Sequence, residues 1–395
     1  MKKRKTLKTK KIIVLLIVSI VLASILPAPL SFVFADDDDS YSERVDDLID
    51  SFDFEILDEA LGKYLEDFEY GGQSFVSLLK EYLKSDKSEL TDTGNFFGYI
   101  AKIFSSEFKG LLSVFVSVFA IAVLSGLLRS VGLKNGAMSE TAGLICSTVA
   151  SALIFGETAT IALSVLGFVS EIIGTMEAAT PVFVTLSALS GGVSKNNALT
   201  PVCSFAIQGV NVVVSKILFP AVGVTCAVTA IAPLADGDAA GKIRDTIADA
   251  FKWFVGISVS LLSLITAISG ISGSVKDGIS RRALKYAVGN AIPVIGGFAK
   301  EGVDVVLVAS QAVKSGVGAL FSLILLLSFM KPVLRILCFS LGLKLLGVAA
   351  APVAEKSFSN LLSGFSKVVD MLAILLVAIL ILFFFLTYSL LLFQA

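Results

Sequence analysis

Ionisable side chains inside long apolar runs are the residues of this chain that could do chemistry. They are Glu157, Glu171, Glu177, Lys216, Asp304, Lys314, Arg335 and Lys344. Each would cost about 2.5–3.5 kcal/mol at the centre of a lipid-facing helix. We therefore expect these side chains to face the interior of a helix bundle, to reach an interface, or to pair with one another.

Three polar residues in one apolar stretch form the first candidate site: Gln208, Asn211 and Lys216. Their positions leave no lipid-tolerant face on a helix, which predicts that protein encloses it. A lysine that snorkels to the interface would give the same pattern, and so would polar contacts that hold subunits together. We keep these residues as candidate polar membrane or assembly positions.

Prolines begin or interrupt the apolar runs, and they allow two interpretations. They stand at Pro181, Pro201, Pro220, Pro293, Pro332 and Pro352. Broken helices near the bilayer midplane occur in solute transporters, where the freed backbone groups line a cavity. Proline and glycine are also common in ordinary spanning helices. On the first interpretation, the candidate solute path is formed by residues 201–220 and 293–297, with the pair Gly296 and Gly297.

Recognisable chemistry of soluble enzymes is absent. The chain has no histidine, and its four cysteines lie in apolar stretches without a C-x-x-C pair. No phosphate-loop, dinucleotide, serine-hydrolase or zinc-protease motif occurs. Asp304 and Asp370 lack the sequence contexts of an intramembrane aspartyl protease. We expect no enzyme, no cofactor, no metal and no nucleic-acid partner, and we interpret the cysteines as small buried hydrophobic residues.

Membrane-spanning helices are the elements that must position these residues. Hydrophobic residues make up 55% of the 395, the mean hydropathy is +0.87, and about 20 residues of helix cross a bilayer core. We predict an all-α polytopic helical membrane protein with about eight crossings and an external C-terminus, with cationic anchors near Arg129 and Arg281 on the cytoplasmic side. The predicted crossings are 110–128, 137–156, 158–176, 201–233, 253–275, 315–330, 332–353 and 371–395.

Residues 1–35 have the pattern of a signal peptide. Residues 1–11 hold seven Lys/Arg and no acid, residues 12–26 are apolar, and small residues precede a cleavage point after Ala35. An uncleaved signal anchor is the alternative. In either case, the chain that follows lies outside the cytoplasm.

Residues 36–107 are predicted to form a small acidic helical domain outside the cytoplasm, before a membrane domain over 108–395. The segment holds twenty acidic and six basic residues. Its apolar residues recur at helical spacing: Val45, Leu48, Ile49, Phe52, Leu57, Leu61, Tyr64, Leu65, Phe68, Phe75, Leu78, Leu79, Tyr82 and Leu83. So short a segment forms only a small core, so we expect it to pack on the membrane domain or on a partner.

Residues 276–320 are the most distinctive stretch: KDGISRRALKYAVGNAIPVIGGFAKEGVDVVLVASQAVKSGVGAL. Its cations, its backbone break and its acidic pair are Arg281, Arg282, Pro293, Gly296, Gly297, Glu301 and Asp304. This block resembles the signature region of the stage III sporulation protein AE family of endospore-forming bacteria. The order of signal peptide, acidic exported segment and multi-spanning body agrees with that family.

The resemblance implies an integral membrane subunit of a channel-like complex between the mother cell and the engulfed forespore. The complex would be needed for continued forespore development and late forespore gene expression. Implied partners are the other stage III sporulation A-operon proteins and stage II sporulation protein Q. Apart from the resemblance, we expect contact with the lipid bilayer and with further copies of the chain. The implied location is the mother-cell-derived outer forespore membrane, with residues 36–107 in the intermembrane space. The alternative that the residues leave open is a transporter or permease moving a small solute through broken helices.

Overall fold

The structure, a computed structural model, is helical throughout its regular elements. It describes residues 39–66, 73–84, 93–131, 136–189, 193–234, 239–261, 264, 296–352 and 356–392, and no strand occurs among them. In these ranges five helices are long and apolar enough to cross a membrane, by length and composition. The predicted all-α, multi-pass class is confirmed.

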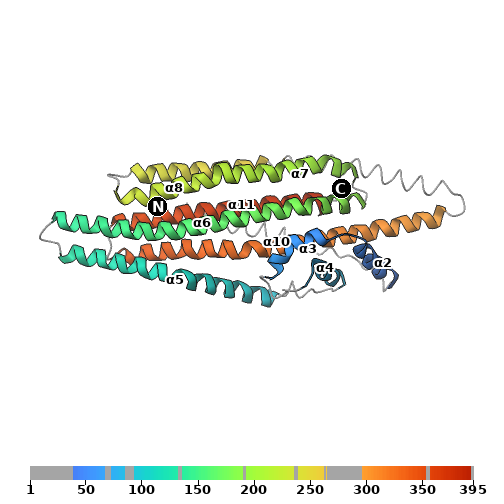
Figure 1. Cartoon of the computed structure of the whole chain (residues 1–395), viewed down its shortest axis with the longest axis horizontal. Helices are drawn as coiled ribbons and strands as arrows, with labels where there is room; N and C mark the ends of the chain where they lie inside the picture. The colour runs from blue at the N-terminus through green and yellow to red at the C-terminus, as the bar shows by residue number, and fades with distance from the viewer. Residues whose placement is uncertain are drawn as a thin grey trace, which may run out of the picture.

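Four long helices run side by side along the molecule (Figure 1): α5 (Thr93–Val131), α6 (Gly136–Leu189), α10 (Gly296–Ala350) and α11 (Lys356–Thr387). α6 has 54 residues and α10 has 55, so each is about 80 Å long at 1.5 Å per residue. A bilayer core of about 30 Å covers less than half of that length. The two helices therefore extend well beyond one membrane.

A π-helix joins α7 to α8. The chain is helical without a break through α7 (Val193–Val213), η3 (Val214–Leu218), α8 (Phe219–Ile231) and η4 (Ala232–Leu234), and a further helix covers 239–261. Pro220 has no N–H to donate, and its ring would collide with the carbonyl four residues earlier in a regular helix. The wider π turn accommodates it, and the Phe219 N–H donates to the Val214 carbonyl.

The acidic segment forms three short helices that pack on α6 and α10: α2 (Asp39–Asp50), α3 (Glu55–Glu66) and α4 (Phe75–Lys84). Buried Leu57, Leu61, Phe75 and Leu79 belong to the same hydrophobic core as the long helices. The expectation that this short segment packs on the membrane part is confirmed. α5 is continuous through position 107, and the predicted domain boundary there stays a prediction.

Two ends of the bundle are used as reference points below. α2–α4, the start of α10 and the end of α11 with η5 (Tyr388–Leu392) lie toward one end, which we call the docked end (Figure 1). The end of α5 and the start of α6 lie at the other, which we call the far end. α5 and α10 therefore run from the docked end to the far end, and α6 and α11 run back.

Two predicted pairs of crossings are wrong, because each pair is a single helix. Segments 137–156 and 158–176 both belong to α6, and 315–330 and 332–353 lie in or directly after α10. The separators did not end the helices: Glu157 is paired with Arg335 of α10, and α10 continues through Pro332 although proline donates no backbone hydrogen bond. Most of the predicted crossing at 253–275 lies outside the described residues. The count of eight is not supported by these helices.

Candidate functional site

Charged side chains from three helices meet inside the bundle. Arg335 of α10 lies between Glu107 of α5 and Glu157 of α6: its Nε is 3.8 Å from a Glu107 carboxylate oxygen, and its Nη2 is 3.4 Å from one of Glu157. The Glu107 and Glu157 side chains are 19% and 20% exposed, so the cluster is largely shielded. One cation serves two carboxylates here, which fixes the relative positions of α5, α6 and α10.

A second pair joins α10 to α11. Lys344 Nζ lies 3.1 and 3.2 Å from the two carboxylate oxygens of Asp370. The Ser340 hydroxyl donates to Asp370 at 2.6 Å, and its Oγ is 3.3 Å from that of Ser366. The Lys344 and Asp370 side chains are 51% and 44% exposed. Unlike the Arg335 cluster, this pair faces the surroundings of the bundle.

A third pair joins α11 to helix 239–261. Lys367 Nζ lies 2.7 Å from a carboxylate oxygen of Asp245, which also accepts a hydrogen bond from Arg244 at 2.9 Å. α11 approaches closely here at Gly364, where a Cβ would lie 2.5 Å from Arg244 Nη1 and 2.8 Å from a Thr229 methyl. Only glycine allows this approach without a shift of its neighbours.

The acidic segment is held at the docked end by both apolar and ionic contacts. Lys63 of α3 lies 3.3 Å from Glu171 of α6, and the neighbouring Tyr64 is buried. Burial raises the pKa of the Tyr64 hydroxyl, so this hydroxyl docks in its neutral form. At Gly316 of α10 a Cβ would lie 2.8 Å from the end of the Leu83 side chain, which shows how closely α4 packs there.

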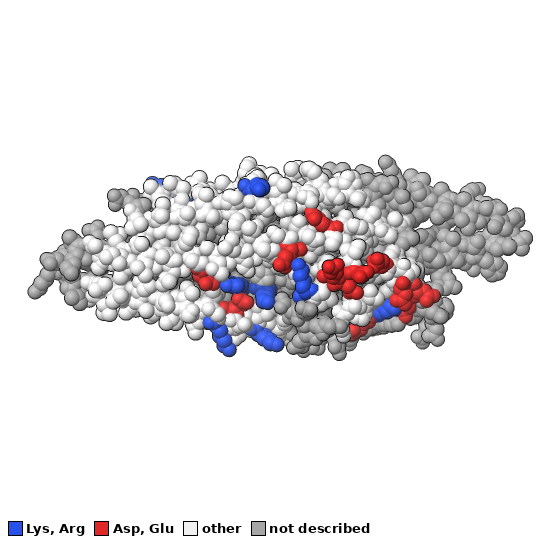
Figure 2. Space-filling view, viewed as in Figure 1, with Lys and Arg blue, Asp and Glu red and all other residues white. Residues whose placement is uncertain are grey.

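Charged residues are unevenly distributed along the molecule. On the face shown in Figure 2 they gather over α2–α4 and the middle of the bundle, and the far-end part of this face is nearly free of them. The pairs described above therefore occur within a bundle that has an extended uncharged surface on this face.

The three polar residues predicted as a site lie on one continuous helical segment, in α7 and η3. Gln208 donates a short hydrogen bond to Glu177 of α6, and Asn211 accepts one from Ser215 at 3.3 Å. Gln208 and Lys216 are exposed, so none of the described helices covers this face, and enclosure of the helix by protein stays a prediction. The sequence did not show that the polar partner of Gln208 lies on another helix. Its role in assembly stays a prediction.

The signature block is described only in part. Its glycine pair, Gly296 and Gly297, begins α10. The other predicted positions, or their side chains, lie outside the described residues: Arg281, Arg282, Pro293, Glu301 and Asp304. Their function as polar membrane or assembly positions stays a prediction.

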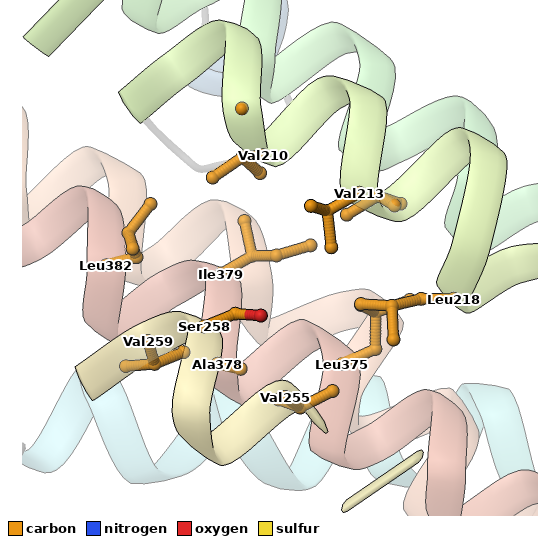
Figure 3. Close-up of a pocket in the computed structure, with 12 residues that line it drawn as sticks. Val210, Val213, Leu218, Val255, Ser258, Val259, Leu375, Ala378, Ile379 and Leu382 are labelled. Carbon is orange, nitrogen blue, oxygen red and sulfur yellow. The ribbon is translucent and has the colours of Figure 1, made fainter. Parts of the chain in front are cut away.

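An apolar hollow lies between α7, helix 239–261 and α11 (Figure 3), close to the proposed solute path. It has about 390 Å³ of empty space, part of it open to the surroundings, and Ser258 is the one polar side chain among its lining residues. Val213 and Ile379 approach each other across it. Because residues 201–220 form a continuous helical segment and the hollow is apolar, the described helices do not provide the broken, polar path that the transporter interpretation requires.

The pairs identify functional candidates that the sequence analysis missed. Glu107, Asp245 and Lys367 were not singled out, and Asp370 was considered only as a protease residue. One signal was present: Lys367 and Asp370 are three residues apart at the edge of an apolar run and so share a helix face. The partners of these residues lie on other helices, and no nearby sequence pattern predicts which residues they are.

The cysteines and acids provide no metal centre in the described part of the chain. All four cysteines are buried and none forms a disulfide, which confirms their interpretation as buried hydrophobic residues. Within the described ranges, no group of three or more His, Cys, Asp or Glu side chains could hold a metal ion.

Comparison with known proteins points to one family. Residues 73–392 match the family described as stage III sporulation protein AE. Stage III sporulation protein AE of Bacillus subtilis (strain 168) is 22% identical over 366 residues, which cover 89% of this chain and 89% of that protein. No solved structure matches. The matched range includes α4, the long helices and all of the charged pairs within the bundle.

Proposed function

This chain belongs to the stage III sporulation protein AE family, and from that premise we propose that it is a membrane subunit of the sporulation channel complex linking mother cell and engulfed forespore. The family makes it a sporulation protein, and five apolar helices make it a multi-pass membrane protein. In the proposed role it is needed for continued forespore development and late forespore gene expression. We assign it no reaction, since the family is named for sporulation and not for an enzyme activity.

The observation that carries the proposal is the docking of α2–α4 on the long helices (Figure 1). Phe75 and Leu79 are fully buried in this contact, whereas Asp47, Asp50 and Glu59 remain exposed. A short acidic segment held in a fixed place on a membrane bundle is suited to contact other proteins beside the membrane. It is too small to be an independent enzyme domain.

We place the chain in the mother-cell-derived outer forespore membrane, with residues 36–107 in the intermembrane space. Its proposed partners are the other stage III sporulation A-operon proteins, to which the family name assigns it, stage II sporulation protein Q of the same complex, and further copies of the chain. The signal-peptide pattern of residues 1–35 supports export of the acidic segment.

Microscopy of starved cells lacking the gene tests this proposal. We expect forespores to shrink or stall after engulfment, and the intact chain to restore them. A chain carrying Phe75→Ala should restore them poorly because α2–α4 loses its anchor, and Lys63→Ala, at an exposed ion pair, should restore them fully. Normal heat-resistant spores from the deletion strain would refute the role.

A further inference from the structure

One side of the bundle exposes apolar side chains over the thickness of a membrane. Residues 110–128 of α5 carry no charge and are flanked by Lys109 and Arg129, and their length of about 29 Å matches a bilayer core. The outward side chains of this run are 39–59% exposed: Leu112, Val116, Phe119, Leu124 and Leu127. This surface suits contact with lipid.

Another side exposes polar side chains. The first half of α11 carries polar residues every three or four positions, which places them on one face, and a charged residue from each neighbouring helix flanks that face. We call these six residues the α11 polar stripe: Asn360, Ser363, Lys367, Asp370, Lys344 and Asp245. Asn360 and Ser363 are exposed. The four charged side chains are 42–51% exposed.

The two surfaces lie at the same depth along the bundle. Phe115, in the first third of the apolar run of α5, stacks on Phe339 of α10 with 5.9 Å between ring centroids. Ser340, the next residue of α10, lies 3.3 Å from Ser366 in the polar half of α11. A bilayer that covers residues 110–128 therefore also covers the α11 polar stripe.

Lipid does not suit the stripe. A charged side chain facing lipid at the centre of a helix costs about 2.5–3.5 kcal/mol, and the stripe holds four that are half exposed. Lys344 is already paired with Asp370, and Lys367 with Asp245. The four charges of the stripe cancel one another, and Arg244, whose side chain is 11% exposed, adds a further cation beside Asp245. The exposed parts of the four charged stripe side chains still require hydration.

We propose that the α11 polar stripe faces water within the membrane and lines an aqueous passage, while the exposed face of α5 contacts lipid. This inference rests on the proposed function in one respect, because it requires the bundle to be embedded in a bilayer. Beyond the proposed function, the inference identifies the α11 side of the subunit as the side that borders the passage.

Two matched serine substitutions test the inference in the full chain. Ser363→Cys places a thiol in the stripe, and Ser117→Cys places one on the exposed face of α5, within about one helical turn of the same depth. The four native cysteines are buried and provide the unlabelled background. The probe is a charged, membrane-impermeant methanethiosulfonate, applied to membrane vesicles that contain the protein. Asn360→Cys serves as a second stripe variant if Ser363→Cys folds poorly.

We expect the stripe thiol to react at least about tenfold faster than the α5 thiol, because only the thiolate reacts and apolar surroundings suppress it. Both variants should label equally after denaturation. A stripe thiol as unreactive as the α5 thiol would overturn the inference. If this unreactive stripe thiol forms disulfide-linked dimers on oxidation, a second copy of the chain covers the stripe. Rapid labelling of both thiols would show instead that α5 does not contact lipid, so that the membrane placement itself fails.

Discussion

The ring of Phe115 in α5 occupies the space that a side chain on Gly342 of α10 would need. The same ring stacks on Phe339 at an interplanar angle of 15°. At this point of their contact, an aromatic side chain of α5 packs against the backbone of Gly342 in α10. This contact fixes the depth of the apolar run of α5 relative to α10.

Gly342→Ala should destabilise the protein by about 1–3 kcal/mol, the usual effect of overpacking a tight contact. The added Cβ would clash with the rigid ring of Phe115, so α5 and α10 must move apart. Thermal unfolding in detergent measures the effect. Gly347→Ala in the same helix is the control, because its Cβ would lie 3.9 Å from Leu362, an ordinary contact. Equal unfolding midpoints for the two variants would contradict this prediction.

Arg335→Met should destabilise the bundle by roughly 2 kcal/mol or more, because it leaves two shielded carboxylates without a cation. The expected loss is below that of a fully buried pair, since the Arg335 side chain is 33% exposed. Adding Glu107→Gln and Glu157→Gln should recover most of the stability. Arg335→Lys keeps the charge and is the control. Full stability of the single Arg335→Met variant would show that the cluster contributes little.

Phe75→Ala should release α2–α4 from the long helices. Phe75 is completely buried, and its ring centroid lies 6.0 Å from that of Phe54. Truncating a buried Phe to Ala costs about 3–5 kcal/mol of stability. Lys63→Ala should cost less than about 1 kcal/mol, because its ion pair with Glu171 is half exposed. Limited proteolysis of membranes that contain each variant measures the difference. We expect the Phe75→Ala chain to be cleaved before α5 faster than the Lys63→Ala chain. A protected Phe75→Ala variant would mean that other contacts hold the segment.

The four native cysteines should remain unmodified by a membrane-permeant maleimide until the protein is denatured. Cys146, Cys203, Cys226 and Cys338 are all buried in the bundle. Mass spectrometry before and after denaturation counts the labelled thiols. Labelling of Cys203 or Cys226 in the folded protein would show that α7 or α8 detaches from the bundle.

Helix class and local periodicity were predictable from the sequence. The apolar spacing from Leu57 to Leu65 and from Phe75 to Leu79 corresponds to the buried faces of α3 and α4. That signal is local, because residues three or four apart share a helix face. The charge-free tail likewise identified the second half of α11.

Helix ends were harder to predict, because partners distant in the sequence decide them. Glu157 in an apolar run suggested a turn, but Arg335, far along the chain, compensates its charge and α6 continues. Pro332 suggested a hairpin, yet α10 runs through it. The charged pairs were missed for the same reason: Asp245 and Lys367 are 122 residues apart, and a single sequence contains no sign that they meet.

The shared position of α2–α4 and η5 at the docked end decides how reporter proteins fused to this chain should behave. Whichever way the bundle is inserted, a tag placed behind Leu392 enters the compartment that holds the acidic helices. If that compartment is the exported one, a C-terminal alkaline phosphatase becomes active there, and a fluorescent protein that matures only in the cytoplasm stays dark. A tag meant for imaging therefore has to tolerate export, or be inserted at the far end between α5 and α6.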